Sequence, residues 1–216
     1  IGVFSFLYFF LRVFGQWQTG KKQILPYLGT SLLAGGASMV MILPMFLDLR
    51  SNGEALTEIT KFKTEATGAL DFFIKNMIGV YDTTKYGSIP FIYAGVLPLV
   101  FVLFYFASNR IAFKQKLLSL VLFSIMIASF YIVPLNLFWH GMHAPNMFLF
   151  RYAFLLSFFL LMLAGYGWEQ LTKDDYGLFL GLILTLIIAF SIAYGLIPKD
   201  QYTYLNVQSF LLTIVF

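Results

Sequence analysis

Two histidines, an asparagine and an arginine lie close together in the sequence, at the start of a long apolar run. His140, His143 and Asn146 precede the apolar run Phe148–Trp168. Arg151 is the one charged residue in this run. A guanidinium can bind a phosphate through two parallel hydrogen bonds, and the N–H groups at a helix N-terminus also favour anions. The pattern predicts a site for an anionic lipid headgroup, with Arg151 as the phosphate ligand and the other three as further binding residues.

Each of these residues also has a plainer interpretation. Arg151 could extend its side chain to the lipid headgroups without a specific ligand, and Asn146 could cap the following helix. His140 and His143 could donate hydrogen bonds, act as a general base or bind a metal, but two histidines alone are a weak metal signal. We therefore expect no metal site and no cofactor, although a divalent metal stays an open alternative.

A second polar cluster lies at residues 81–88, before another apolar run. Asp82 is a candidate for orienting a hydroxyl or accepting its proton, and Lys85 and Tyr86 are candidate substrate-binding residues. The alternative is an ordinary polar turn before a helix. The sequence has no phosphate-binding glycine loop, no nucleophile elbow and no metalloprotease helix, and the absence of cysteine excludes a catalytic thiol.

The composition is that of an integral membrane protein. Apolar residues make up 60% of the 216, charged residues only 11%, and the mean hydropathy is +0.82. Soluble domains average about 25% charged residues. The net charge of +4 is not gathered into a basic stripe, so we expect membrane lipid as a partner and no nucleic acid.

The apolar runs predict an all-α, polytopic membrane bundle with about five complete spans. The predicted spans are Ile24–Leu47, Ile89–Phe106, Leu117–Val133, Phe148–Trp168 and Tyr176–Ile197. Pro98 is predicted to kink the second of them. Small-residue patches at 33–38 and at Gly177 and Gly181 are typical of close helix packing. The chain starts and stops inside apolar runs, which predicts two truncated spans and an internal piece of a longer protein, with residues 1–216 in a single membrane domain.

The basic residues gather in alternate loops, which predicts the topology. By the positive-inside rule, the loops Asp48–Ser88, Pro134–Met147 and Pro198–Asn206 share the outer side. The longest of them carries many apolar residues, so we expect it to fold back on the membrane as short helices at Ala55–Phe62 and Ala69–Met77. Its acidic residues show no paired spacing and are expected on a solvated face.

Two stretches resemble the YfhO family of bacterial membrane proteins. They are YDTTKYGSIP at Tyr81–Pro90 and NMFLFRYAFLLSFFLLMLA at Asn146–Ala164, and the likeness extends loosely over the whole chain. This family is similar to the GT-C class of membrane glycosyltransferases. The resemblance implies a GT-C-like bundle in the bacterial cell membrane that transfers a sugar from a polyprenyl-phosphate carrier to a cell-envelope polymer such as lipoteichoic acid.

The same resemblance limits which residues can be given a catalytic role. GT-C enzymes usually carry their catalytic acid in the first outer loop, which is expected upstream of Ile1, so the catalytic residue of this chain stays unknown, with Asp82 as a weak candidate. Arg151 matches the family's Asn…Arg-Tyr stretch and becomes the candidate for the lipid-phosphate contact. A lipid or solute transporter or flippase is the alternative, but the predicted spans carry no charge near their centres, where transporters often keep one.

Overall fold

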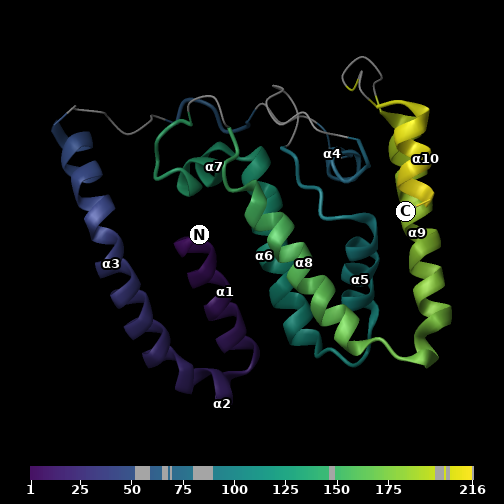
Figure 1. The fold of residues 1–216 in the computed structure, drawn as a ribbon, viewed down its shortest axis with the longest axis horizontal. Coiled ribbons are helices and arrows are strands. Elements are labelled where there is room, and N and C mark those ends of the chain that lie inside the picture. Colours follow the sequence, from purple (N-terminus) through teal and green to yellow (C-terminus); the bar gives the residue numbers. More distant parts are fainter. Residues whose placement is uncertain are drawn as a thin grey trace. The chain divides into compact units, whose positions relative to one another are not determined.

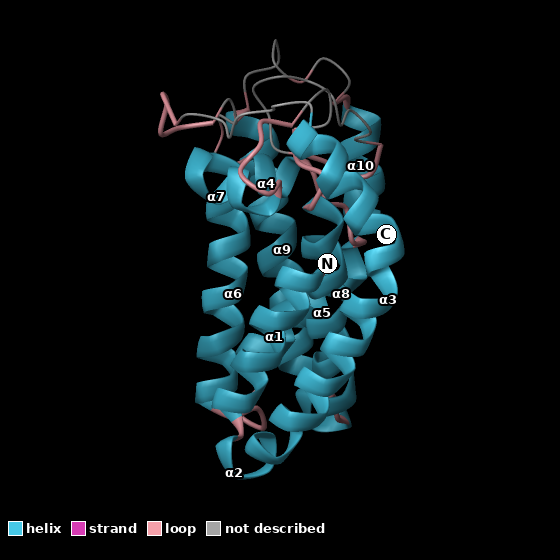
Figure 2. Ribbon diagram, turned by 90° about the vertical axis from the view of Figure 1, so that its left-hand side faces the viewer, coloured by secondary structure: helices cyan, strands magenta, loops and turns pink. Residues whose placement is uncertain are grey.

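The chain folds into helices in the computed structural model (Figure 1). The structure describes residues 1–51, 59–64, 68, 70–79, 90–145, 149–197, 202 and 205–215, and for 49–51 the backbone only. In these residues an isolated antiparallel bridge between Lys63 and Ile132 is the single β-type pairing, and Figure 2 draws helices joined by loops. The all-α fold class is therefore confirmed.

The chain divides into two compact units. One comprises Gly2–Glu58, and the other comprises Ile59–Phe216 together with Ile1. The single membrane domain expected for residues 1–216 stays a prediction.

The first unit is a pair of helices joined by a short helical connection. It contains α1 (Gly2–Gly15), α2 (Trp17–Gly20), the 3-10 turn η1 (Lys21–Gln23) and α3 (Ile24–Ser51). The stretch Trp17–Asp48 is long and apolar enough to cross a membrane, and its most apolar part has no buried residue. Pro26 is the third residue of α3, where a missing N–H costs little.

The second unit carries the remaining helices. They are α4 (Asp71–Ile74), α5 (Val96–Ala107), α6 (Phe113–Tyr131), α7 (Val133–Trp139), α8 (Ala153–Gln170), the 3-10 turn η2 (Lys173–Asp175), α9 (Tyr176–Leu196) and α10 (Val207–Val215). Three of its stretches, 113–131, 153–170 and 173–196, have the length and hydropathy of membrane spans. With Trp17–Asp48, the described residues contain four such spans and the shorter apolar helices α1 and α5.

Helices α5 and α8 pack closely against each other at a glycine. A Cβ atom on Gly167 of α8 would lie 2.3 Å from the carbonyl oxygen of Phe101 and 3.3 Å from the amide nitrogen of Tyr105, both on α5. A hydrogen at this position lets the two backbones touch, as small residues do between membrane helices. The small residues that the sequence analysis singled out do not do this within the chain, since Gly35, Gly36, Gly177 and Gly181 have nothing within 4 Å of their Cβ positions.

One end of the second unit, here called the α7 end, gathers the described parts of three predicted outer loops. The amide of Val133 donates to the carbonyl of Phe62 over 2.9 Å, and the Tyr202 hydroxyl donates to the Asp71 carboxylate. Figure 1 shows α4 and α7 at this same end. The loops therefore lie together, as the topology predicted, and the membrane face to which they belong stays a prediction.

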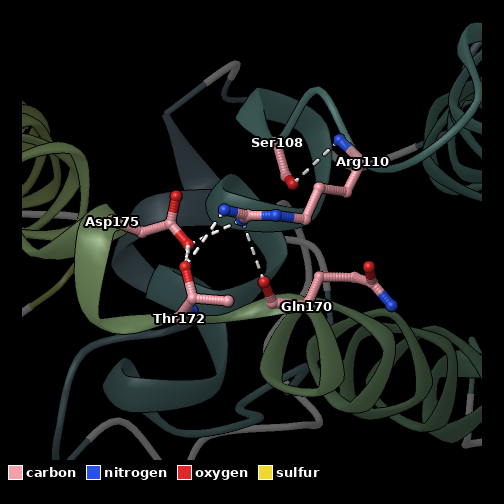
Figure 3. Close-up of polar contacts among 5 residues, drawn as sticks. All are labelled: Ser108, Arg110, Gln170, Thr172 and Asp175. Atoms are coloured by element: carbon pink, nitrogen blue, oxygen red, sulfur yellow. Dashed lines mark hydrogen bonds and ion pairs between the residues drawn. The ribbon is translucent and has the colours of Figure 1, made fainter.

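The opposite end, here called the Arg110 end, joins two loops through one guanidinium. Nη1 of Arg110 donates to the carboxylate of Asp175 over 2.6 Å and to the carbonyl of Gln170 over 3.1 Å. Nη2 donates to the hydroxyl of Thr172 over 3.0 Å (Figure 3). Thr172 and Asp175 also form a capping box on each other, so this network fixes the turn between α8 and α9.

Three expectations about the elements differ from the structure. The helix expected at Ile89–Phe106 begins only at Val96, because 90–95 are non-helical, so Pro98 lies in the first turn of α5 and makes no kink. The last predicted-helix residues of Ala55–Phe62, 59–62, are not helical, while residues 55–58 lie outside the described residues. The expected helix Ala69–Met77 is reduced to the single turn α4.

Candidate functional site

Ser129, near the end of α6, connects the three elements that meet at the α7 end. Its hydroxyl accepts a hydrogen bond from the indole N–H of Trp139 over 2.9 Å and donates to the carbonyl of Ile125 over 2.7 Å. Its carbonyl accepts from the hydroxyl of Tyr152 over 2.7 Å. Ser129 is fully buried, so these bonds fix α7 and the start of α8 against α6.

The side chains held by Ser129 form an aromatic stack. The Tyr152 ring stacks on Trp139 with centroids 5.3 Å apart and on Phe130 with centroids 5.5 Å apart. Tyr152 is 4% exposed, and burial raises the pKa of its phenol, which stays neutral. Trp139 is thus part of a packed cluster, with its N–H bonded inside the protein.

His140 lies at the edge of this stack, with its ring 5.6 Å from that of Tyr152. Its Nδ1 is 2.9 Å from the carbonyl oxygen of Asn136. A carbonyl only accepts, so Nδ1 carries the hydrogen. Burial lowers the pKa of His140, the hydrogen bond to Asn136 opposes this, and the positive charge of Arg151 lowers it further. The imidazole is therefore neutral, with its lone pair on Nε2.

Two atoms of this region are buried without hydrogen-bond partners in the structure. They are Nε2 of His140 and Oδ1 of Asn136, both of which are acceptors. A buried acceptor without a donor costs on the order of 1–3 kcal/mol. Such atoms are exceptions in native proteins, and they leave hydrogen-bonding capacity for a ligand at this end.

The structure places the other sequence-predicted residues only in part. Arg151 is exposed and lies in the turn before α8, two residues ahead of Ala153, and so it precedes the helix in whose first turn it was expected. His143 is partly exposed, in the turn after α7. Asp82, Lys85, Tyr86 and Asn146 lie outside the described residues. In the described part of the chain, no three His, Cys, Asp or Glu side chains are grouped to hold a metal.

A buried polar cluster lies around α4, where the sequence predicted acidic residues on a solvated face. Asp71 is 3% exposed, Lys75 is fully buried and Tyr202 is 2% exposed, so the expectation of a solvated face for the loop acids is wrong for Asp71. Its carboxylate accepts from the Tyr202 hydroxyl and from the amide of Gly68. The signal in the sequence was the apolar set Phe72, Phe73, Ile74 and Met77. When these side chains pack against the bundle, the neighbouring Asp71 and Lys75 are buried with them.

An apolar cavity of about 200 Å³ lies between α5, α9 and α10. Val100, Leu186, Phe190 and Thr213 are among the residues that line it. The cavity adjoins the α4 turn, because the Phe190 ring contacts Phe73 and the Thr213 hydroxyl accepts from the amide of Ile78 over 2.9 Å. Its lining suits a hydrocarbon chain better than a polar solute.

The comparisons with known proteins agree with a helical membrane protein. The model of the family described as bacterial membrane protein YfhO matches residues 1–216, which is the whole chain. No curated protein and no solved structure matches the sequence. On the evidence of the family model and of its apolar helices, the chain belongs to the YfhO family of bacterial membrane proteins.

Proposed function

We propose that the protein is a membrane glycosyltransferase. It transfers a sugar from a polyprenyl-phosphate carrier to a cell-envelope polymer such as lipoteichoic acid, on the outer face of the bacterial cell membrane. The family membership supports this proposal through the likeness of YfhO proteins to the GT-C class. The catalytic residue is not assigned, and Asp82, Lys85, Tyr86, His143 and Asn146 stay predicted site residues.

The observation that carries the proposal is the position of Arg151 beside the neutral His140. The exposed guanidinium of Arg151, just before α8, acts through its charge on His140, whose cluster keeps unpaired acceptors. The guanidinium suits the phosphate of a lipid-linked donor, and the unpaired acceptors suit sugar or polyol hydroxyls. The apolar cavity at the same end of the unit suits the prenyl chain of such a donor.

The test is sugar transfer by the full-length protein in nanodiscs, with a polyprenyl-phosphate sugar at limiting concentration. A charge-assisted hydrogen bond contributes about 1.5–3 kcal/mol, so Arg151→Ala should lower kcat/KM for the donor roughly 10- to 150-fold. The kcat/KM of Arg151→Lys should lie between the values of the wild type and of Arg151→Ala, because an ammonium keeps the charge but lacks the planar pair of donors of a guanidinium.

Lys114→Ala is the matched control, since it removes an exposed charge near the start of α6, at the Arg110 end. Membrane insertion and melting temperature are measured for every variant. Wild-type donor kinetics in a correctly inserted Arg151→Ala protein would reduce Arg151 to a headgroup anchor. Transport of the lipid without sugar transfer would favour a flippase.

A further inference from the structure

We propose that His140 is the general base that accepts the proton of the acceptor hydroxyl, through Nε2. This inference rests on the proposed glycosyl transfer and adds to it a second substrate position beside the phosphate contact at Arg151. It assigns the role to a half-buried side chain whose Nε2 atom is buried and whose hydrogen-bonding state the structure defines.

One hydrogen bond defines the tautomer of His140. Nδ1 of His140 lies 2.9 Å from the Asn136 carbonyl, four residues earlier in the chain, and must donate to it. A neutral imidazole whose Nδ1 donates carries its lone pair on Nε2, as a base needs. The same bond fixes the direction of the ring at the C-terminal end of α7.

The Nε2 atom of His140 is an acceptor that the structure leaves unused. Nε2 is buried and unpaired in the structure, although Ser129, Trp139 and Tyr152 around it satisfy their polar atoms within the cluster. The hydroxyl of Tyr152 already donates to the Ser129 carbonyl, so it does not serve Nε2. A hydroxyl from outside the cluster completes the pairing.

An acceptor can reach Nε2 only after a local movement, because this atom is covered in the conformation of the structure. Gly141 and Met142 follow His140 directly, with φ of +67° and +66°. For methionine this left-handed conformation is strained, and such strain persists where the surrounding structure enforces it and gathers at ligand-binding sites. A shift of this turn uncovers the imidazole when the acceptor binds.

The chemical step balances without a further reactant. The acceptor oxygen forms a bond to the anomeric carbon of the sugar as its proton passes to Nε2 of His140. The bond between the anomeric carbon and the phosphate oxygen breaks, and polyprenyl phosphate leaves with the electron pair. The imidazolium then returns its proton to water.

Charge near His140 links this step to donor binding. Arg151 acts on the imidazole, the nearby Tyr152 phenol is neutral, and α6 presents the uncharged Ser129 and Phe130 to the same stack. In the free protein the positive charge of Arg151 opposes protonation of His140. A phosphate bound to Arg151 offsets that charge, so the imidazole becomes a stronger base when the donor is in place.

The test compares His140→Gln with Lys114→Gln, a change of an exposed residue near the start of α6, in the full-length protein. Glutamine keeps an acceptor atom but does not take up a proton at neutral pH, so kcat should fall at least about 100-fold while KM for the donor changes little. The acidic limb of the wild-type kcat profile should disappear in His140→Gln and persist in Lys114→Gln. Insertion and melting temperature confirm that both variants fold.

A spectroscopic readout tests the tautomer without turnover. Nitrogen NMR of histidine-labelled wild-type protein, with His140→Gln used to assign the signal, should show the proton on Nδ1. A proton on Nε2, or full transfer by His140→Gln with an unchanged pH profile, overturns the inference and leaves the proposed function standing. Absence of transfer by the wild-type protein overturns both.

Discussion

The two ends of the 59–216 unit differ in how their polar groups are paired. At the Arg110 end, the guanidinium, the Thr172 hydroxyl and the Asp175 carboxylate bond to one another and to the Gln170 carbonyl. These groups lie at the surface and use each other as partners. The network joins the α5–α6 loop to the α8–α9 loop, as a connection between helices requires.

At the α7 end, the polar groups are buried and only partly paired. Ser129, Trp139 and Tyr152 satisfy one another, whereas Nε2 of His140 and Oδ1 of Asn136 have no partner in the structure. Stability alone favours pairing or removal of such atoms, since each leaves its desolvation cost uncompensated. The Arg110 end therefore holds helices together with paired groups, whereas the α7 end keeps unpaired acceptors, which we propose are used by a ligand.

The largest effect should come from separating the helices that connect the two ends. Gly167→Ala places a Cβ 2.3 Å from the Phe101 carbonyl oxygen, a backbone atom that cannot swing away. Overpacking of this kind costs about 1–3 kcal/mol, so thermal unfolding in nanodiscs should begin at a clearly lower temperature. The shift of α8 should also disturb the Arg110 network and the Tyr152 stack together.

Gly165→Ala is the matched control for this change. A Cβ on Gly165, in the same helix, meets nothing within 4 Å, so alanine should be neutral or slightly stabilising through its better helix propensity. Equal melting temperatures for the two variants would show that the α5–α8 contact does not couple the ends.

A smaller effect is expected from the buried hydrogen bond at the α7 end. Tyr152→Phe keeps the ring between Trp139 and Phe130 but removes the donor to the Ser129 carbonyl. The loss should be about 1 kcal/mol of unfolding free energy. Tyr194→Phe is the control, because that ring stacks on Phe210 and its hydroxyl has no partner among the described residues. An unchanged unfolding free energy in Tyr152→Phe would mean that the aromatic stack alone holds the start of α8 against α6.

Much of the fold follows from the sequence because membrane helices need long apolar runs. The runs near 24–47, 117–133 and 176–197 yield α3, α6 and α9 within a few residues of their expected limits. The run at 89–106 does not, because apolarity cannot distinguish the non-helical segment before Val96 from the helix after it. The close approach at Gly167 was also missed, since a glycine's sequence neighbours do not reveal which helix faces it.

The sequence predicted some residues of the candidate site but not the hydrogen bonds that hold the site together. The spacing of His140 and Arg151 placed them near one membrane end, and the charge of Arg151 does act on the imidazole. The role of Ser129 was not foreseeable, because a single serine in an apolar run gives no signal of a buried junction. The burial of Asp71 was not predictable either, because it depends on contacts with Gly68 and with Tyr202, which is distant in the sequence.

The smallest effect should follow from removing the Arg110 side chain. Its side chain is 42% exposed, and surface ion pairs contribute little because water and salt screen them. The Thr172–Asp175 capping box persists without it, since the bonds from the Thr172 N–H to the Asp175 carboxylate and from the Asp175 N–H to the Thr172 hydroxyl both lie within the turn. Arg110→Ala should therefore lower the melting temperature less than Tyr152→Phe does, and added salt should reduce the difference from wild type.

The same variant tests the contrast between the two ends most directly. Sugar transfer by Arg110→Ala should match the wild type under conditions where Arg151→Ala is impaired, because the Arg110 network has its partners within the protein and none left for a substrate. Lys114→Ala again controls for the loss of an exposed charge at this end. A folded Arg110→Ala protein that loses transfer would show that the paired end also takes part in the reaction, and the division of roles between the ends would be wrong.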